Sequence, residues 1–181
     1  VQWITVPVQM KGHLSKLFRE IEVEAPKKWR KKYLRTLEQT YRKAPFYEDI
    51  QPIIKVVSEE KSGFLASLNI QIIKTICKIL SIETELVSAS ELDVSGNKSD
   101  LLVGILKEVN ATEYLMGKYG YDYIDLALFE TAKIKIHDHE FNYPDYTPFN
   151  FNENFYPDKP SVLDVIANLG AKRVSMILQN E

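Results

Sequence analysis

Short β-branched runs alternate with amphipathic helical patterns in the second half of the chain, and this alternation restricts the fold more than any other feature. The runs predict strands at 84–88, 113–116 and 133–137, and the patterns between them predict helices over 99–109 and 121–131. Strands that are separated by crossover helices usually pair in parallel. The sequence therefore predicts an α/β fold in which a mostly parallel sheet is flanked by helices.

The first half of the chain and its C-terminal end add mainly helices. Pro26 suits the first turn of a helix that runs to Lys43, with an apolar stripe at Trp29, Tyr33, Leu37 and Tyr41. The other predicted elements are strands at 1–9 and 20–24, helices over 47–60 and 64–80, and a last helix from Ser161 that stops at Gly170. A long aromatic and Pro-rich loop over 141–160 precedes that last helix.

The composition is that of one soluble globular domain. The chain has 181 residues, of which 45% are hydrophobic and 27% are charged, and this length is sufficient for a single core. No run approaches the roughly 18 apolar residues of a membrane helix, and no signal segment opens the chain. The net charge of −2 gives no overall attraction to nucleic acid or to anionic membranes. A single cysteine, Cys77, fits a reducing cytoplasm.

The chain opens inside a predicted strand, V-Q-W-I-T-V-P-V-Q at residues 1–9. Natural domains seldom begin within a core strand, because chain termini are usually loose. We therefore expect that N-terminal sequence is missing, and that residues 1–181 form one domain without that segment.

A tyrosine-rich stretch with two glycines, E-Y-L-M-G-K-Y-G-Y-D-Y-I-D at 113–125, contains the first candidate site. Tyr114 ends a predicted strand, Gly117 and Gly120 frame the loop that follows, and Tyr123 lies in the next predicted helix. Ligands of parallel α/β sheets bind where strands lead into helices, and glycines there let a ligand approach the backbone. The alternative is a tight turn in which the glycines supply positive φ. The spacing does not match G-x-G-x-x-G, so no dinucleotide cofactor is expected.

A second candidate follows the predicted strand at 84–88. The sequence S-G-N-K-S-D places Lys98 and Ser99 at the start of a helix. The partial positive charge of a helix N-terminus and the ammonium of Lys98 favour a bound anion. The alternative for Ser99 is a simple helix cap. Residues 91–94 lack the earlier glycine of a phosphate-binding Walker A loop.

Two further residues stand out on the predicted helix over 64–80. Asn69 shares a face with Leu65, Ile72, Ile73 and Ile76. A polar group on such a face needs hydrogen bonds, so Asn69 either braces a neighbouring loop or contacts a ligand. Cys77 lies among isoleucines and is expected to pack as a small apolar residue.

Other clusters have an ordinary structural explanation. The run K-K-W-R-K-K-Y-L-R at 27–35 is typical of a solvated helix face, with a phosphate-bearing substrate, a membrane surface or RNA as alternatives. His137 and His139 share a strand face with two lysines, so a wet surface explains them and no metal site is expected. Asp164 and Asn168 fall on one face of the last helix, where a site role is secondary.

Six short motifs follow one another along the chain: W-I-T-V-P-V at 3–8, Y-R-K-A-P-F-Y at 41–47, L-N at 68–69, S-G-N-K-S at 95–99, Y-L-M-G at 114–117 and S-V-L-D-V-I-A-N-L-G at 161–170. Their order resembles the WbqC-like protein family over essentially the whole chain. The family also carries a segment similar to H-Q-P-N-Y-x-P-W before the first motif, and this sequence does not contain it.

The resemblance implies a cytoplasmic protein of bacterial surface-polysaccharide (O-antigen) biosynthesis. Its implied activity is transfer of a glycyl or other small acyl group to a sugar intermediate, either a nucleotide sugar or a lipid-linked sugar. The alternative is a non-catalytic binding or scaffold component of a polysaccharide-assembly complex. The predicted substrate-binding residues are Lys98, Ser99, Asn69, Tyr114, Gly117 and Tyr123, and no catalytic residue or cofactor is assigned.

Overall fold

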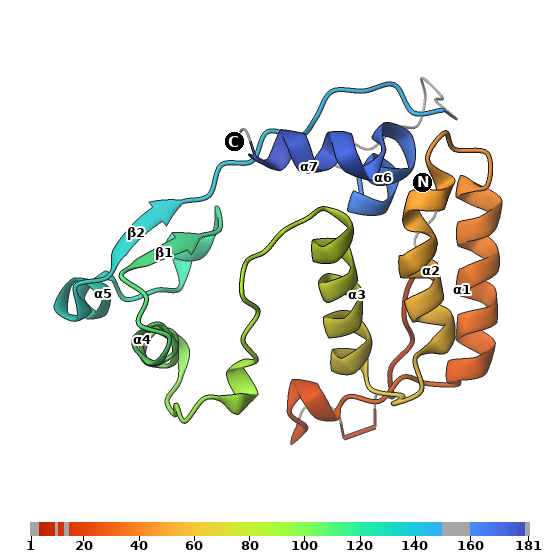
Figure 1. The fold of residues 1–181 in the computed structure, drawn as a ribbon. Coiled ribbons are helices and arrows are strands. Elements are labelled where there is room, and N and C mark those ends of the chain that lie inside the picture. Colours follow the sequence, from red (N-terminus) through yellow and green to blue (C-terminus); the bar gives the residue numbers. More distant parts are fainter. Residues whose placement is uncertain (1–3, 10, 13–14, 150–159, 180–181) are drawn as a thin grey trace. The chain divides into compact units, whose positions relative to one another are not determined.

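The computed structural model describes residues 4–9, 11–12, 15–149 and 160–179. Its contacts divide the chain into two compact units (Figure 1). Unit 1 consists of Val1–Thr84 together with Pro144–Glu181, and unit 2 consists of Glu85–Tyr143. Each unit has its own core and is described separately below.

Unit 1 is built from helices. They are α1 (Pro26–Tyr41), α2 (Gln51–Glu59), α3 (Leu65–Ile79), α6 (Val162–Leu169) and α7 (Ala171–Gln179). Helix α2 packs against both α1 and α3 (Figure 1), while α6 packs on α7 and on a short 3-10 helix, Tyr47–Ile50. The chain therefore returns after unit 2 to complete the helical packing that it began in its first 84 residues.

The core of unit 1 has two apolar clusters. The first joins the 3-10 helix to α6 through Ile50 and Ile166, which are both fully buried. The second joins α1, α2 and α3 through Trp29, Val57 and Leu68. The indole Nε1 of Trp29 donates to the Thr5 carbonyl oxygen at 3.0 Å, so the N-terminal segment is attached to α1.

Gly170 separates α6 from α7, and the reason is steric. Its φ is +82°, and a Cβ at this position would lie 2.8 Å from Cδ1 of Phe46. The Asp49 carboxylate accepts a hydrogen bond of 2.7 Å from the Ala171 N–H, the first of α7. The predicted stop at Gly170 is confirmed, but helix α7 beyond it was not predicted.

Unit 2 contains one β-α-β crossover. Strands β1 (Glu113–Met116) and β2 (Lys135–Asp138) pair in parallel, with Glu113 opposite Lys135, and α5 (Leu126–Ala132) connects them. Helix α4 (Lys98–Glu108) packs on α5. A small core of Val103, Phe129 and Ile134 lies between these elements. The predicted α/β class is confirmed, although the two-stranded sheet is a minor part of the described structure.

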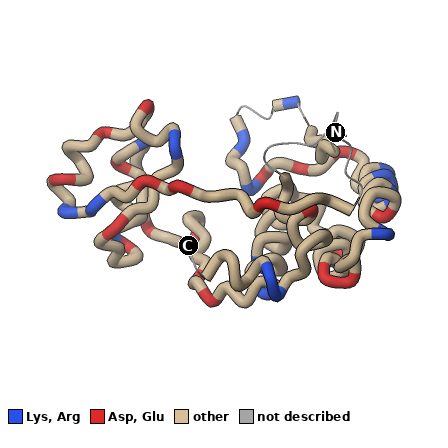
Figure 2. Tube along the Cα trace, turned by 90° about the horizontal axis from the view of Figure 1, so that it is seen from above, with Lys and Arg blue, Asp and Glu red and all other residues tan. Residues whose placement is uncertain are grey.

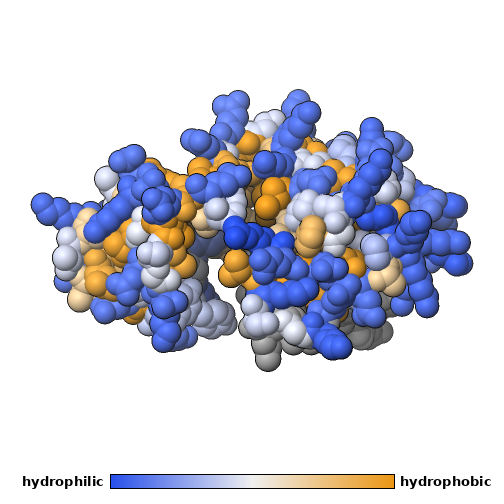
Figure 3. Space-filling model, turned by 90° about the horizontal axis from the view of Figure 1, so that it is seen from below, coloured by the Kyte–Doolittle hydropathy of each residue, from blue (hydrophilic) through white to orange (hydrophobic). Residues whose placement is uncertain are grey.

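One face of this sheet is open. Tyr114 and Ile136 pack into the core of unit 2, whereas Leu115, the next residue of β1, is 62% exposed. Figure 3 shows apolar side chains at the molecular surface among hydrophilic ones. The alternation of buried and exposed residues is that of a sheet covered on one side.

Three predicted strands are wrong in the described part of the chain. Residues 4–9 and 20–24 make only isolated antiparallel bridges, Val8 with Val23 and Glu22 with Phe64, and residues 1–3 lie outside the described residues. Residues 84–88 have no strand partner, and Val87 is 50% exposed. A β-branched run shows that its residues favour an extended backbone, but a strand forms only where a second segment completes its hydrogen bonds.

The predicted helices are close to the observed ones, with differences at their ends. The predicted helix over 47–60 begins as a 3-10 helix and becomes α2 at Gln51, and that over 121–131 begins only at Leu126. Of the predicted loop over 141–160, residues 150–159 lie outside the described residues. Among the helices that the structure describes, none has the length and apolar character needed to cross a membrane.

Candidate functional site

The start of α4 carries the predicted anion site. Helix α4 begins at Lys98, whose φ of +49° is left-handed and whose side chain is exposed. Asn97 precedes it and makes no side-chain cap. Asp100 lies in the first turn of the helix, so an ammonium and a carboxylate share the helix end. The carboxylate interacts favourably with the helix dipole and opposes a second anion.

Ser99 makes a structural contact that the sequence did not predict. Its side chain is buried, at 6% exposure, and its Oγ accepts a hydrogen bond of 2.8 Å from the backbone N–H of Asp125. Ser99 is therefore not the cap of α4. Asp125 is itself the N-cap of α5, where its Oδ1 accepts from the Ala127 N–H at 3.1 Å. One hydrogen bond thus connects the first turns of α4 and α5.

This contact joins the start of α4 to Asp125, at the end of the tyrosine-rich stretch. The sequence predicted instead that both candidate loops follow strands of a parallel sheet. Residues 84–88 form no strand, so the loop before α4 follows no strand in the described structure. The Ser99 hydroxyl and the packing of Ile124 in the core beside Val103 hold α4 next to residues 124–125 instead.

The two glycines of the tyrosine-rich stretch serve different purposes. A Cβ on Gly120 would overlap Cγ and Sδ of the fully buried Met116, whereas a Cβ on Gly117 would have open space around it. The Gly120 N–H donates to the Gly117 carbonyl oxygen at 2.8 Å, so a turn is present. Neither glycine has positive φ, however, so the expectation that they supply it is wrong. Packing requires Gly120 to be small, and the backbone of Gly117 is accessible to a ligand.

The tyrosines of this stretch divide into one core residue and three surface residues. The Tyr114 ring packs on Phe129, with 5.5 Å between the ring centroids, and is half-buried. Tyr119, Tyr121 and Tyr123 are exposed. The pKa of Tyr121 is raised, with loss of hydration as the largest cause even though its ring is half exposed, and the hydrogen bond and charge of Asp138 add to the shift. Exposed phenol rings offer both an apolar face and a hydroxyl to a ligand.

Asn69 is in unit 1, whereas the other five predicted site residues are in unit 2. It lies half-buried on α3, and its amide makes no hydrogen bond with any other residue that the structure describes. The alternative in which Asn69 braces a neighbouring loop is therefore wrong for the described residues. Its contact with a ligand stays a prediction.

His137 in β2 and His139 just after it form no metal site with other described residues. His137 Nε2 lies 3.3 Å from Glu113 Oε2, within ion-pair distance but without hydrogen-bond geometry. No three His, Cys, Asp or Glu side chains of the described chain are close enough to hold one metal ion.

Asp164 and Asn168 hold a returning segment against α6. The Tyr146 hydroxyl donates to Asp164 Oδ2 at 2.6 Å, and the Phe149 N–H donates to Asn168 Oδ1 at 2.8 Å. The Asn168 amide in turn donates to the Asp164 carbonyl oxygen at 2.8 Å. These two residues therefore position residues 146–149 within unit 1.

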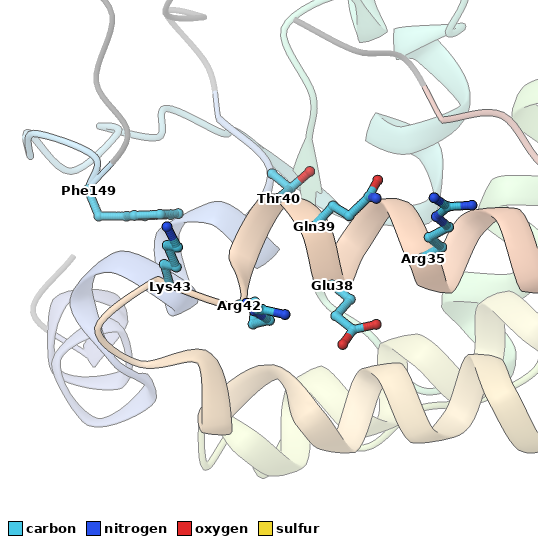
Figure 4. A pocket seen from close by; sticks show the side chains of 7 residues that line it. All are labelled: Arg35, Glu38, Gln39, Thr40, Arg42, Lys43 and Phe149. Atoms are coloured by element: carbon cyan, nitrogen blue, oxygen red, sulfur yellow. The ribbon is translucent and has the colours of Figure 1, made fainter.

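A cavity of about 650 Å³ lies beside the C-terminal half of α1 (Figure 4). Six of its lining residues come from the end of α1 and the turn after it, and the seventh is Phe149 from the returning segment; they are Arg35, Glu38, Gln39, Thr40, Arg42, Lys43 and Phe149. The basic run at 27–35 ends at Arg35. The extra cations at positions 42 and 43 were a visible signal, but the proximity of Phe149 depends on the tertiary fold.

The chain belongs to the WbqC-like protein family, whose family model matches residues 1–176. This confirms the predicted family. The chain is also 30% identical over 173 residues to the uncharacterized protein Rv1507c of Mycobacterium tuberculosis, in an alignment that covers 95% of this chain and 74% of that protein. No solved structure matches the chain.

Proposed function

We propose that this protein acts in bacterial surface-polysaccharide (O-antigen) biosynthesis and that unit 2 binds a sugar intermediate carrying a diphosphate. Membership of the WbqC-like family supports the pathway. The observation that carries the site is the hydrogen bond from the Asp125 N–H to Ser99 Oγ. It joins Ser99, which follows Lys98, to Asp125, two residues after the exposed Tyr123. On this support we propose that the Lys98 ammonium and the Tyr123 ring contact the same ligand.

The chemistry of this surface suits a phosphorylated sugar. The Lys98 ammonium and the unpaired N–H groups at the start of α4 attract phosphate oxygens. The ring of Tyr123 offers a face for the apolar side of a sugar ring, and the open backbone at Gly117 lets a ligand approach closely. Asp100 opposes anion binding at the same helix end, so we expect binding to be moderate and sensitive to salt.

The proposed reaction transfers a glycyl or other small acyl group to the bound sugar. A hydroxyl or amine of the sugar forms a bond to the acyl carbonyl carbon, the bond from that carbon to the donor's leaving group breaks, and the acceptor's proton passes to solvent. We assign no residue to the proton transfer. The donor must therefore arrive activated, as a thioester or an acyl phosphate, because an amide or free acid has a poorer leaving group.

Thermal unfolding in the presence of nucleotide sugars tests the binding step. A ligand that binds only the folded protein raises its melting temperature, and we expect Lys98→Ala to reduce that rise. Incubation of the bound nucleotide sugar with glycyl thioester, followed by mass spectrometry of the sugar, then tests transfer. Binding without any acylated product would leave unit 2 as a binding module and remove the transferase activity from the proposal.

A scaffold role in a polysaccharide-assembly complex is the second candidate. Its support is the basic face of α1, where four lysines are exposed: Lys27, Lys28, Lys31 and Lys32. Figure 2 marks the Lys and Arg positions along the chain in blue. Exchange of two of these lysines for glutamine should leave the stability of the protein within about 0.5 kcal/mol of the parent. If such a variant folds normally but no longer assembles with the other polysaccharide enzymes, the scaffold role gains over the transferase.

A further inference from the structure

The cavity beside the end of α1 differs in position and chemistry from the surface proposed on unit 2. All seven of its lining residues belong to unit 1. Its volume of about 650 Å³ falls within the range of small-molecule sites in proteins. Nothing in the proposed acyl transfer uses it, so its chemistry has to be explained separately.

The cavity is electropositive. Arg35, Arg42 and Lys43 line it against a single carboxylate, Glu38. None of the three cations forms an ion pair within 4.0 Å among the described residues. By contrast, Arg30 on the same helix is paired with Glu60 at 3.3 Å. Three guanidinium and ammonium groups are therefore free to bind an anion, and arginine is well suited to phosphate oxygens.

The helix dipole explains only part of this arrangement. Cations near a helix C-terminus are stabilised by its partial negative charge, and Arg42 and Lys43 follow the last residue of α1. Arg35 lies nearly two turns before that end, beyond the range of the effect. Phe149 comes from a segment more than one hundred residues away in sequence, and a dipole gives no reason for it.

The aromatic wall is held in place by specific hydrogen bonds. The Phe149 N–H donates to Asn168 Oδ1 at 2.8 Å, and Asn168 is itself bonded to Asp164 on the same helix. Figure 4 shows the half-buried Phe149 ring at one end of the cavity, with the Lys43 side chain reaching toward it from α1's end. The hydrogen bond holds the Phe149 backbone, and the ring packs against the core of unit 1. A ligand in the cavity therefore meets both the ring and the cations.

We propose that this cavity binds a nucleoside diphosphate, with its phosphates on Arg35, Arg42 and Lys43 and its base against Phe149. A diphosphate has enough oxygens to bind all three unpaired cations, whereas a ligand with a single carboxylate does not. A planar base matches a fixed ring, because stacking on an aromatic side chain tolerates any base. Gln39 and Thr40 line the same cavity and offer polar groups for ribose hydroxyls.

Isothermal titration calorimetry with ADP, UDP and GDP, each at about 50 mM salt, tests this site. Inorganic pyrophosphate serves as the probe that has the phosphates but no base. The double variant Arg42→Gln with Lys43→Gln should bind all four ligands about 10- to 100-fold more weakly, as expected for lost charged hydrogen bonds. Both side chains are exposed, so the melting temperature of the variant should match the parent.

Phe149→Leu separates the two halves of the ligand. We expect it to lower the affinity for the nucleoside diphosphates by about 3- to 10-fold, the usual scale of an aromatic contact. The affinity for pyrophosphate should not change. The matched charge control is Lys27→Gln with Lys28→Gln, which removes two cations from the same helix outside the cavity. That control should bind every ligand as tightly as the parent.

Several results would overturn the inference. Parent protein that binds none of the four ligands at millimolar concentration has no such site. If the cavity variant and the Lys27 and Lys28 control lose the same amount of ligand affinity, the binding is non-specific charge attraction. Loss in Lys98→Ala with no loss in the cavity variant would move the ligand to unit 2, which would support the proposed function and end this inference. Binding of single-stranded RNA or anionic vesicles that depends on Lys27 and Lys28, without nucleotide binding, would favour a macromolecular partner instead.

Discussion

The Nη2 atom of Arg30 lies 3.3 Å from Oε2 of Glu60 and also donates a hydrogen bond to the Glu60 carbonyl oxygen. The Glu60 side chain is almost completely buried, at 2% exposure, and further accepts from the backbone N–H groups of Ser62 at 2.7 Å and Gly63 at 3.4 Å. The pair connects the first half of α1 to the turn between α2 and α3. Of the basic residues in the run at 27–35, which the sequence predicts to be solvated, Arg30 therefore has a structural role.

This pair gives the first prediction, which concerns stability. Glu60→Ala should lower the free energy of unfolding by about 3–5 kcal/mol, because the guanidinium of Arg30 is left partly buried without its partner. The neighbouring Glu59 is the matched control: its carboxylate lies 4.0 Å from Lys55, and both side chains are well exposed. Glu59→Ala should change stability by less than about 0.5 kcal/mol. Urea unfolding measures both, and equal midpoints would contradict the buried pair.

The second prediction concerns the bond that joins α4 to α5. Ser99→Ala should lower the free energy of unfolding by about 0.5–1.5 kcal/mol, since the Asp125 N–H loses its acceptor in a part-buried hydrogen bond. Hydrogen exchange at the Asp125 amide should accelerate in step with that loss. Ser95→Ala, at an exposed position before the helix, should leave both measurements unchanged. Slow exchange at Asp125 in the Ser99 variant would mean that another group satisfies the amide.

The third prediction separates the two glycines of the tyrosine-rich stretch. Gly120→Ala should destabilise the protein by about 1–3 kcal/mol, because the new Cβ overlaps the buried Met116 side chain. Gly117→Ala has open space and no positive φ, so it should leave the stability unchanged or raise it by up to about 1 kcal/mol. Thermal or urea unfolding distinguishes them. If the two variants unfold alike, the packing of Met116 on Gly120 is not as described.

Local sequence signals predicted those parts of the fold that depend on neighbouring residues. Pro26 and the four-residue apolar spacing located α1, and the period of β1 and β2 gave their bounds to within two residues. The predicted strand at 84–88 was wrong, because the residue pattern of one segment does not show whether a partner strand exists. The alternative in which Ser99 caps the helix was wrong for the same reason: a serine at a helix start is usually a cap, yet the partner of Ser99 is 26 residues away.

The candidate sites were predictable to a different degree. The sequence placed Lys98 at a helix start and Gly117 in an exposed loop, and both positions agree with the structure. It grouped Asn69 with them from family motifs, although Asn69 belongs to the other unit. The α1 cavity was missed because its ring comes from Phe149. That residue lies beside α1 through tertiary contacts, namely the hydrogen bond of its backbone to Asn168 and the packing of its ring on the core of unit 1.

The fourth prediction concerns alkaline pH. Burial raises the pKa of Tyr33 above 10.0, and its ring packs on Trp29 with 5.1 Å between centroids. Below pH 10 both folded and unfolded chains keep the phenol proton, and the stability is complete. As the pH rises above 10 the unfolded chain releases the proton first, so stability falls until the folded pKa is passed.

Tyr33→Phe should therefore match the parent in urea midpoint at pH 8 and lose less stability than the parent between pH 8 and pH 10.5. The phenylalanine ring keeps the contact with Trp29, so a difference at high pH reports the proton alone. An identical loss in parent and variant would show that Tyr33 does not titrate differently in the two states.

The last prediction tests the start of α4 with two substitutions of opposite sign. Lys98→Ala should leave the fold almost unchanged, because the side chain is exposed, and should weaken nucleotide-sugar binding by roughly 1.5–3 kcal/mol, the scale of a charged hydrogen bond. Asp100→Asn removes the carboxylate from the first turn and should strengthen the same binding. It should also lower stability by about 0.3–1 kcal/mol, since that carboxylate interacts with the helix dipole. Both binding effects should shrink as salt is added. Calorimetry at low salt decides: if Lys98→Ala binds nucleotide sugars as tightly as the parent, the phosphate site on unit 2 is wrong.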